Sequence, residues 1–96
     1  MSEERVELTA IIRAVPGKHE ALKTALAALV AQTVQEPGCR EFRIFEDREE
    51  PARFVLWEVF ETRQALKDHL SKDYTQAHFA SGLTESTQVL KLRSFV

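Results

Sequence analysis

Four stretches of the chain alternate hydrophobic and polar residues with the period of a β-strand, and others carry hydrophobic residues at helical spacing. The predicted strands are Val6 to Val15, Cys39 to Asp47, Phe54 to Phe60 and Thr87 to Phe95. The predicted helices run from Lys18 to about Gln35, from the N-cap Thr62 to a break at Lys72-Asp73, and, as one or two turns, from Tyr74 to Gly82.

The turns between these stretches define their order. Pro16-Gly17 ends the first strand, Pro37-Gly38 ends the first helix, and Arg48 to Pro51 forms a polar turn. The order is therefore β-α-β-β-α-β, which is the split βαβ or ferredoxin-like arrangement of the α+β class. With 96 residues, the chain is expected to form a single domain covering residues 1–96.

The predicted sheet has more hydrophobic surface than the predicted helices can cover. Both helices pack on one face, whereas the first three strands carry apolar residues on both faces, as with Ile11 and Ile12. A second copy of the same chain is the simplest cover for the other face, so the sequence predicts a homodimer.

Composition excludes several classes of function. The formal net charge is −2 with no basic stripe, which argues against nucleic-acid binding. No apolar run approaches a membrane span, and the acidic start MSEE does not fit a signal peptide, so a cytoplasmic protein without membrane contact is expected. Cys39 is the only cysteine, and no phosphate-binding glycine loop or HExxH pattern is present. We therefore expect no metal and no cofactor.

Two polar residues interrupt hydrophobic patterns between Arg53 and Leu70. Glu58 lies inside an apolar strand, and His69 shares a helical stripe with Leu66 and Leu70. His69 is a candidate general base, with Glu58 as the carboxylate that orients it. The alternative is a core histidine that is hydrogen-bonded to Glu58 or to a backbone carbonyl.

The ordered set of these features resembles the antibiotic biosynthesis monooxygenase (ABM) family. It comprises Pro16-Gly17-Lys18 after the first strand, Glu36-Pro37-Gly38-Cys39 after the first helix, the run Phe54-Val55-Leu56-Trp57-Glu58, and Ala65-Leu66 followed by His69-Leu70. The resemblance implies a dimeric α/β barrel. It also implies a small quinol-monooxygenase-like enzyme that oxygenates a quinol or phenol with O2 and uses no metal or flavin. Aromatic side chains would then line the substrate site: Trp57, Phe60, Phe42, Phe79 and Tyr74.

The chain departs from two specialised branches of that family. Polyketide-oxygenase members have asparagine and tryptophan where this chain has Leu56 and Phe60. Haem-degrading members have asparagine, tryptophan and a ligating histidine where this chain has Ala10, His69 and His78, which argues against haem binding through His78. Two other functions remain open. One is an isomerase-type acid–base enzyme acting on a small carbonyl compound, and the other is a non-catalytic ligand-binding or stress-response barrel.

Overall fold

The structure, a computed structural model, describes residues 5–96 and has the predicted ferredoxin-like α+β fold. The strands are β1 (Val6–Ala14), β2 (Cys39–Glu46), β3 (Arg53–Phe60) and β4 (Thr84–Leu92). The helices are α1 (His19–Thr33), α2 (Arg63–Ser71) and α3 (Asp73–Phe79). The break between α2 and α3 falls at Lys72, whose extended backbone, with φ −63° and ψ 145°, ends one helix and begins the next.

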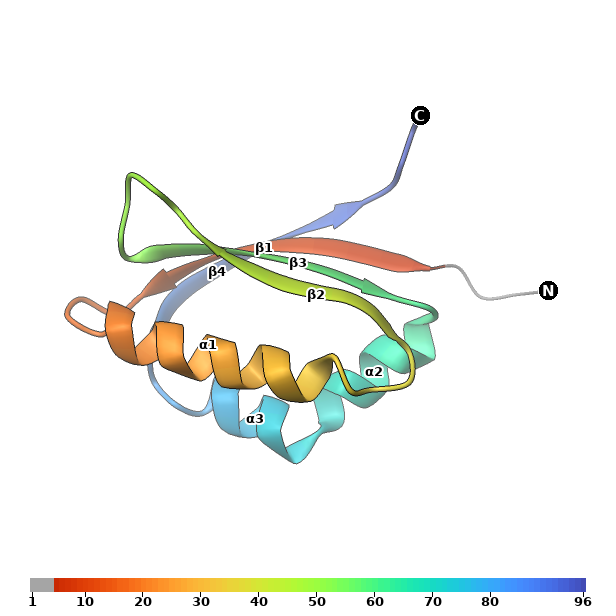
Figure 1. Cartoon of the computed structure of the whole chain (residues 1–96), viewed down its shortest axis with the longest axis horizontal. Helices are drawn as coiled ribbons and strands as arrows, with labels where there is room; N and C mark the ends of the chain where they lie inside the picture. The colour runs from red at the N-terminus through yellow and green to blue at the C-terminus, as the bar shows by residue number, and fades with distance from the viewer. Residues whose placement is uncertain (1–4) are drawn as a thin grey trace.

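The four strands form one antiparallel sheet in the order β2-β3-β1-β4. All three helices lie against the same face of this sheet, with α1 beside β2 and α3 beneath α1 (Figure 1). The opposite face, which we call the open face, carries no helix. The predicted two-layer arrangement is thus confirmed.

The hydrophobic core lies between the sheet and the helices. Alternate residues of β1 and β3 point into it, whereas their neighbours point to the open face, as the period of a strand requires. The buried core consists of Ala10, Ile12, Ala14, Leu22, Leu26, Leu29, Phe42, Phe54, Leu56 and Phe60.

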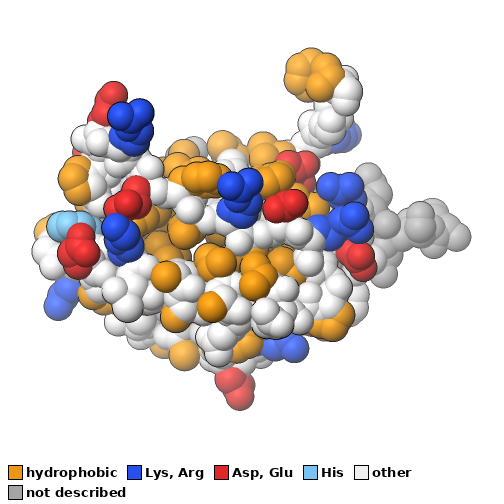
Figure 2. Space-filling model, viewed as in Figure 1, with side chains coloured by type: hydrophobic (Ala, Val, Ile, Leu, Met, Phe, Trp, Pro, Cys, Tyr) orange, Lys and Arg blue, Asp and Glu red, His pale blue; other side chains and the backbone are white. Residues whose placement is uncertain are grey.

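The open face retains exposed hydrophobic side chains. Phe45, Leu90 and Leu92 are each more than 40% exposed, and the strand register places them on this face beside Val55, Thr9 and Glu7. Hydrophobic side chains are visible along the sheet above α1 among charges of both signs (Figure 2). The described chain thus leaves apolar sheet surface uncovered, as the sequence predicts, although the homodimer itself stays a prediction.

The last strand starts earlier than the sequence pattern predicts. Alternation suggests a start at Thr87, but β4 begins at Thr84 and pairs with β1 through a register shift near Arg13. The first residues of β4 are polar and almost the whole strand is exposed, because no helix packs closely on this strand as α1 packs on β2. A strand that buries neither face carries no hydrophobic alternation to mark its start.

Within residues 5–96, no helix is long and apolar enough to span a membrane.

Candidate functional site

The site is built on α2. Its N-terminus is capped by Thr62, whose hydroxyl accepts a hydrogen bond from the Ala65 backbone N–H at 3.0 Å. The cap fixes the start of a short helix that presents His69 to the core. His69 is only 3% exposed, and it is the buried residue of α2. Leu70, by contrast, is 40% exposed, so the predicted stripe holds for His69 but not for Leu70.

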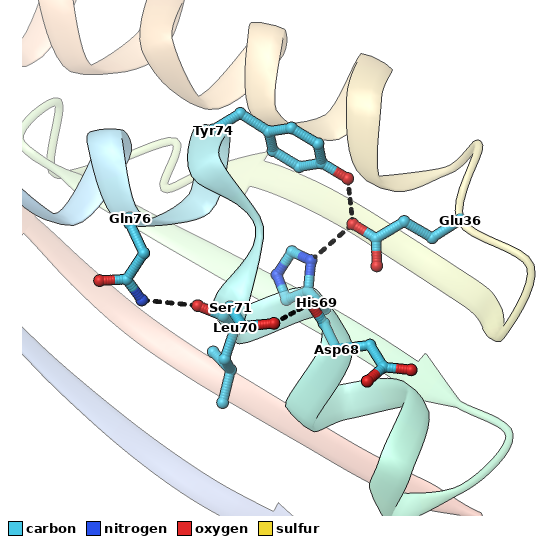
Figure 3. Close-up of polar contacts among 7 residues, drawn as sticks. All are labelled: Glu36, Asp68, His69, Leu70, Ser71, Tyr74 and Gln76. Atoms are coloured by element: carbon cyan, nitrogen blue, oxygen red, sulfur yellow. Dashed lines mark hydrogen bonds and ion pairs between the residues drawn. The ribbon is translucent and has the colours of Figure 1, made fainter.

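The loop after α1 packs directly on α2. An ideal Cβ on Gly38 would lie 2.4 Å from the Ala65 Cβ, so only glycine allows this approach. The loop is also held by hydrogen bonds from the Glu36 N–H to the Thr33 carbonyl and from the Glu61 N–H to the Gly38 carbonyl. This packing brings the Glu36 side chain next to His69 of α2 (Figure 3).

Glu36, His69 and Tyr74 form one buried polar cluster (Figure 3). His69 Nδ1 lies 2.9 Å from Glu36 Oε2, and the Tyr74 hydroxyl donates a hydrogen bond to the same oxygen. The side chains of His69 and Glu36 are 4% and 8% exposed. Burial, followed by the contact with Glu36, raises the pKa of Tyr74 to about 12, so its hydroxyl remains a donor at neutral pH.

This contact fixes the role of each ring nitrogen of His69. A carboxylate only accepts hydrogen bonds, so Nδ1 carries the hydrogen and Nε2 of the neutral ring carries a lone pair. Nε2 has no hydrogen-bond partner within residues 5–96. Nε2 is also not fully enclosed. Within residues 5–96, the fully enclosed side-chain polar atoms that lack a hydrogen-bond partner are the Thr33 and Thr75 hydroxyls, and Nε2 of His69 is not one of them. Nε2 is therefore available to accept a proton from a ligand.

Two phenylalanine rings flank the imidazole. The Phe42 and Phe60 ring centroids lie 5.3 Å and 5.2 Å from that of His69, both in tilted orientations. The two aromatic residues were predicted to line the substrate site, and the structure brings both of them to His69. Both rings belong to the buried core, with Phe42 3% and Phe60 0% exposed, so they pack directly against the imidazole and surround it with apolar atoms.

Glu58 is close to these rings but is not the partner of His69. It points to the helix side of the sheet in register with Leu8 and Phe42, and it is 8% exposed. The predicted Glu58–His69 contact is therefore wrong for the structure: His69 bonds Glu36 instead, and no group within residues 5–96 bonds the Glu58 carboxylate. Burial raises the pKa of Glu58 to about 7.

The remaining predicted site residues are divided between different surfaces. Tyr74 belongs to the cluster, although through Glu36 rather than as a wall of the site. Trp57 lies on the open face, where its indole N–H donates to Glu7 Oε2 at 2.8 Å. Phe79 is 63% exposed near the end of α3, and its ring contacts that of His78. Trp57 and Phe79 thus do not lie with His69.

Sequence reasoning missed Glu36. The sequence pattern identifies Glu36 only as part of the segment Glu36-Pro37-Gly38-Cys39 after the first helix and predicts no role for its side chain. One signal was present: a carboxylate just after the end of a helix faces the negative end of the helix dipole, which is unfavourable unless it has a partner. No basic residue lies in the last turn of α1 to supply one.

The other candidate groups have simpler environments. Burial raises the pKa of the Cys39 thiol to about 11, with Glu36 adding to the effect, so the thiolate nucleophile is scarce at neutral pH. Burial lowers the pKa of His78. Within residues 5–96, no three His, Cys, Asp or Glu side chains are grouped so that they could hold a metal ion.

Comparison with known proteins gives a consistent result. The model of the antibiotic biosynthesis monooxygenase family matches residues 6–81. A solved structure from Shewanella oneidensis is 32% identical, with 95% of this chain and 91% of that chain covered and a TM-score of 0.86. A structure from Pseudomonas aeruginosa is 27% identical, with coverage of 100% and 99% and a TM-score of 0.91. A protein described as an antibiotic biosynthesis monooxygenase shares the fold at 21% identity, 95% and 99% coverage and a TM-score of 0.85. No curated protein matches the chain.

Proposed function

Because the chain belongs to the antibiotic biosynthesis monooxygenase family, we propose that it is a cofactor-independent monooxygenase of a quinol or related phenol. The general base is His69, acting through Nε2. The observation that carries this proposal is the contact between His69 Nδ1 and buried Glu36, because it orients the ring and leaves the other nitrogen free. The carboxylate also stabilises the imidazolium that forms when Nε2 takes a proton.

The chemistry requires the protein to supply few groups. His69 removes the proton of a phenolic hydroxyl, and the resulting anion is a stronger reductant than the neutral substrate. The substrate then reduces O2: one oxygen atom is bonded to a ring carbon and the other leaves as water. For a para-quinol the product is a hydroxyquinone, and all four electrons that O2 accepts come from the substrate. The reaction therefore balances without a metal, a flavin or another reductant.

Phe42 and Phe60 contribute by binding rather than by proton transfer. Their rings flank the imidazole, so an aromatic substrate held against them places its hydroxyl near His69. Burial of apolar rings also keeps water away from the anion, which strengthens its electrostatic stabilisation. The active form is proposed to be a homodimer joined through the open face, whose exposed Leu90, Leu92 and Phe45 would then be buried.

Oxygen uptake with a panel of quinols and phenols tests the proposal. We expect uptake above the rate without protein and a substrate-to-O2 ratio of one. With labelled O2, one label should enter the product, and hydrogen peroxide should not accumulate. Peroxide formation alone would indicate autoxidation, and no uptake above the background rate with any compound of the panel would contradict an oxygenase.

Glu58 favours one alternative function. Its carboxyl group is buried, has no partner within residues 5–96 and has a pKa raised to about 7, which suits a proton shuttle on a small carbonyl compound. Such an isomerase-type enzyme would exchange a carbon-bound hydrogen with solvent deuterium without consuming O2. Binding of ligands without either reaction would instead indicate the non-catalytic barrel.

A further inference from the structure

We propose that a groove between α2 and β4 binds a small amphipathic anion, with an apolar body and a carboxylate, sulfonate or phosphate group. The groove is lined by residues of β1, α2, β4 and the segment that follows β4, and both apolar and cationic side chains are among them. We call it the α2–β4 groove and define it by Leu8, Arg63, Leu66, Lys67, Val89 and Lys91. This inference concerns binding and does not depend on the oxygenase activity.

The charge around the groove is one-sided. Arg5 and Arg93 extend the lining, so that five cationic residues and one carboxylate, Glu7, line it in a protein whose net charge is −2. Glu7 already accepts a hydrogen bond from Trp57 on the open face. None of the five cationic side chains takes part in an ion pair within residues 5–96.

The position of Arg63 adds to this positive potential. It is the first residue of α2, where the helix dipole favours anions, and the first turn of α2 contains no acidic residue. A cation at the N-terminus of a helix and several cations around one groove each oppose folding, and a bound anion relieves both effects. The groove therefore has the electrostatics of an anion site rather than of an ordinary solvated surface.

The floor of the groove explains why the anion should be amphipathic. Leu8 and Leu66 are half-buried, and Val89 is 53% exposed although it lies on the helix side of the sheet. The three side chains are beside the cations, so a ligand can bury an apolar body against them while its charged group meets Lys91 or Lys67. Leu66 lies one helical turn before His69 on α2, whereas His69 itself does not line the groove.

A matched pair of ligands tests the proposal. 2-Naphthalenesulfonate is the anionic probe, and 2-naphthalenemethanol is its neutral analogue of similar size. Calorimetric titration should show that the sulfonate binds at least about 10-fold more tightly than the alcohol, and that its affinity falls as salt is raised. Equal affinity for the two probes, or affinity that salt does not change, would overturn the proposal.

A matched pair of variants locates the site. K67Q/K91Q removes two cations of the groove, whereas K18Q/R48Q removes two exposed cations elsewhere and has the same net charge. The first variant should bind the sulfonate about 3- to 10-fold more weakly, as expected for two surface ion pairs, and the second should bind it normally. Equal loss in both variants would mean non-specific attraction. A change in sedimentation of K67Q/K91Q alone would identify the groove as a contact between copies, and would also refute the proposal.

Discussion

His69 Nδ1 lies 2.9 Å from Oε2 of Glu36, a residue 33 positions earlier in the chain. Neither side chain is more than 8% exposed, so the two polar groups depend on each other for a hydrogen bond. An exposed counterpart exists at the other end of α1, where His19 and Glu20 lie 3.4 Å apart with side-chain exposures of 43% and 79%. The exposed pair serves as an internal control for the buried one.

Glu36→Gln should lower turnover by about 10- to 1000-fold. The amide can still accept the Nδ1–H bond, but it lacks the negative charge that stabilises the imidazolium, and it can also hold the ring in the wrong tautomer. Steady-state kinetics with a quinol that the wild-type protein oxidises measures the effect. Glu20→Gln, the exposed control, should retain wild-type kinetics. Wild-type turnover of Glu36→Gln would exclude Glu36 as a positioning residue.

His69→Ala should lower turnover by about 10²- to 10⁴-fold, the usual contribution of a general base. The same change leaves Glu36 buried without one donor, so a loss of stability of about 1–3 kcal/mol is also expected. Activity must therefore be expressed per folded molecule, beside a melting curve. His19→Ala should change neither quantity appreciably. Full activity per folded molecule in His69→Ala would show that His69 is only structural.

The fold could be predicted because it depends on local patterns. Alternation, Pro-Gly turns and a capped helix each restrict a few neighbouring residues, and together they define the order of the elements. The start of β4 could not be predicted in this way, since the strand is exposed and carries no burial pattern at Thr84. Its pairing with β1 is a long-range property.

The candidate site could be predicted only in part for the same reason. Burial of His69 follows from the spacing of α2, and Phe42 follows from strand alternation. The partner of His69 does not follow from any such pattern, because the chain offers two candidate carboxylates, Glu58 and Glu36. The choice between them depends on how closely the loop at Gly38 approaches α2, which no local pattern specifies.

Gly38→Ala tests this packing. The added methyl group would meet the Ala65 side chain at 2.4 Å, and a backbone Cα also lies near, so the loop must move away from α2. We expect a destabilisation of about 1–3 kcal/mol, typical of overpacking, and a loss of turnover as Glu36 shifts from His69. Chemical denaturation measures the first effect.

The control for Gly38→Ala is a compensating change across the contact. Ala65→Gly removes the methyl group that the new one would strike, so the double variant should regain the positioning of Glu36 and most of the turnover. It should not regain full stability, because glycine inside α2 costs about 1 kcal/mol. If the double variant is no more active than Gly38→Ala, the contact does not position the loop.

Leu90→Glu should convert the proposed homodimer into a monomer. Leu90 is 43% exposed on the open face, and a buried, unpaired carboxylate at an interface is costly. Leu70→Glu is the matched control, because Leu70 is 40% exposed but lies on α2. Sedimentation at micromolar concentration should show a dimer for the wild-type protein and the control. A wild-type protein that sediments as a folded monomer would refute the dimer.

Glu58 should make the stability of the protein depend on pH. Burial raises its pKa from 4.5 to about 7, so the folded state holds this proton more tightly than the unfolded state. The stability that the group contributes is complete below about pH 4.5 and is lost as the pH rises through about 7. Glu58→Gln, which stays neutral, should therefore match the wild-type protein near pH 4.5 and exceed its stability at pH 8 by up to about 3 kcal/mol.

Denaturant unfolding at both pH values measures this difference, with Glu20→Gln as an exposed control that should follow the wild-type curve. Activity then separates the two enzyme proposals. If Glu58 only lines the site, Glu58→Gln is more stable at pH 8 and retains oxygen uptake, because His69 takes the proton. If Glu58 is itself the proton shuttle, the same variant loses turnover while it gains stability, and the wild-type rate changes near pH 7 as the carboxyl group titrates. Equal stability of the variant and the wild-type protein at pH 8 would show that the Glu58 carboxylate is solvated, which would remove the reason to assign it an acid–base role.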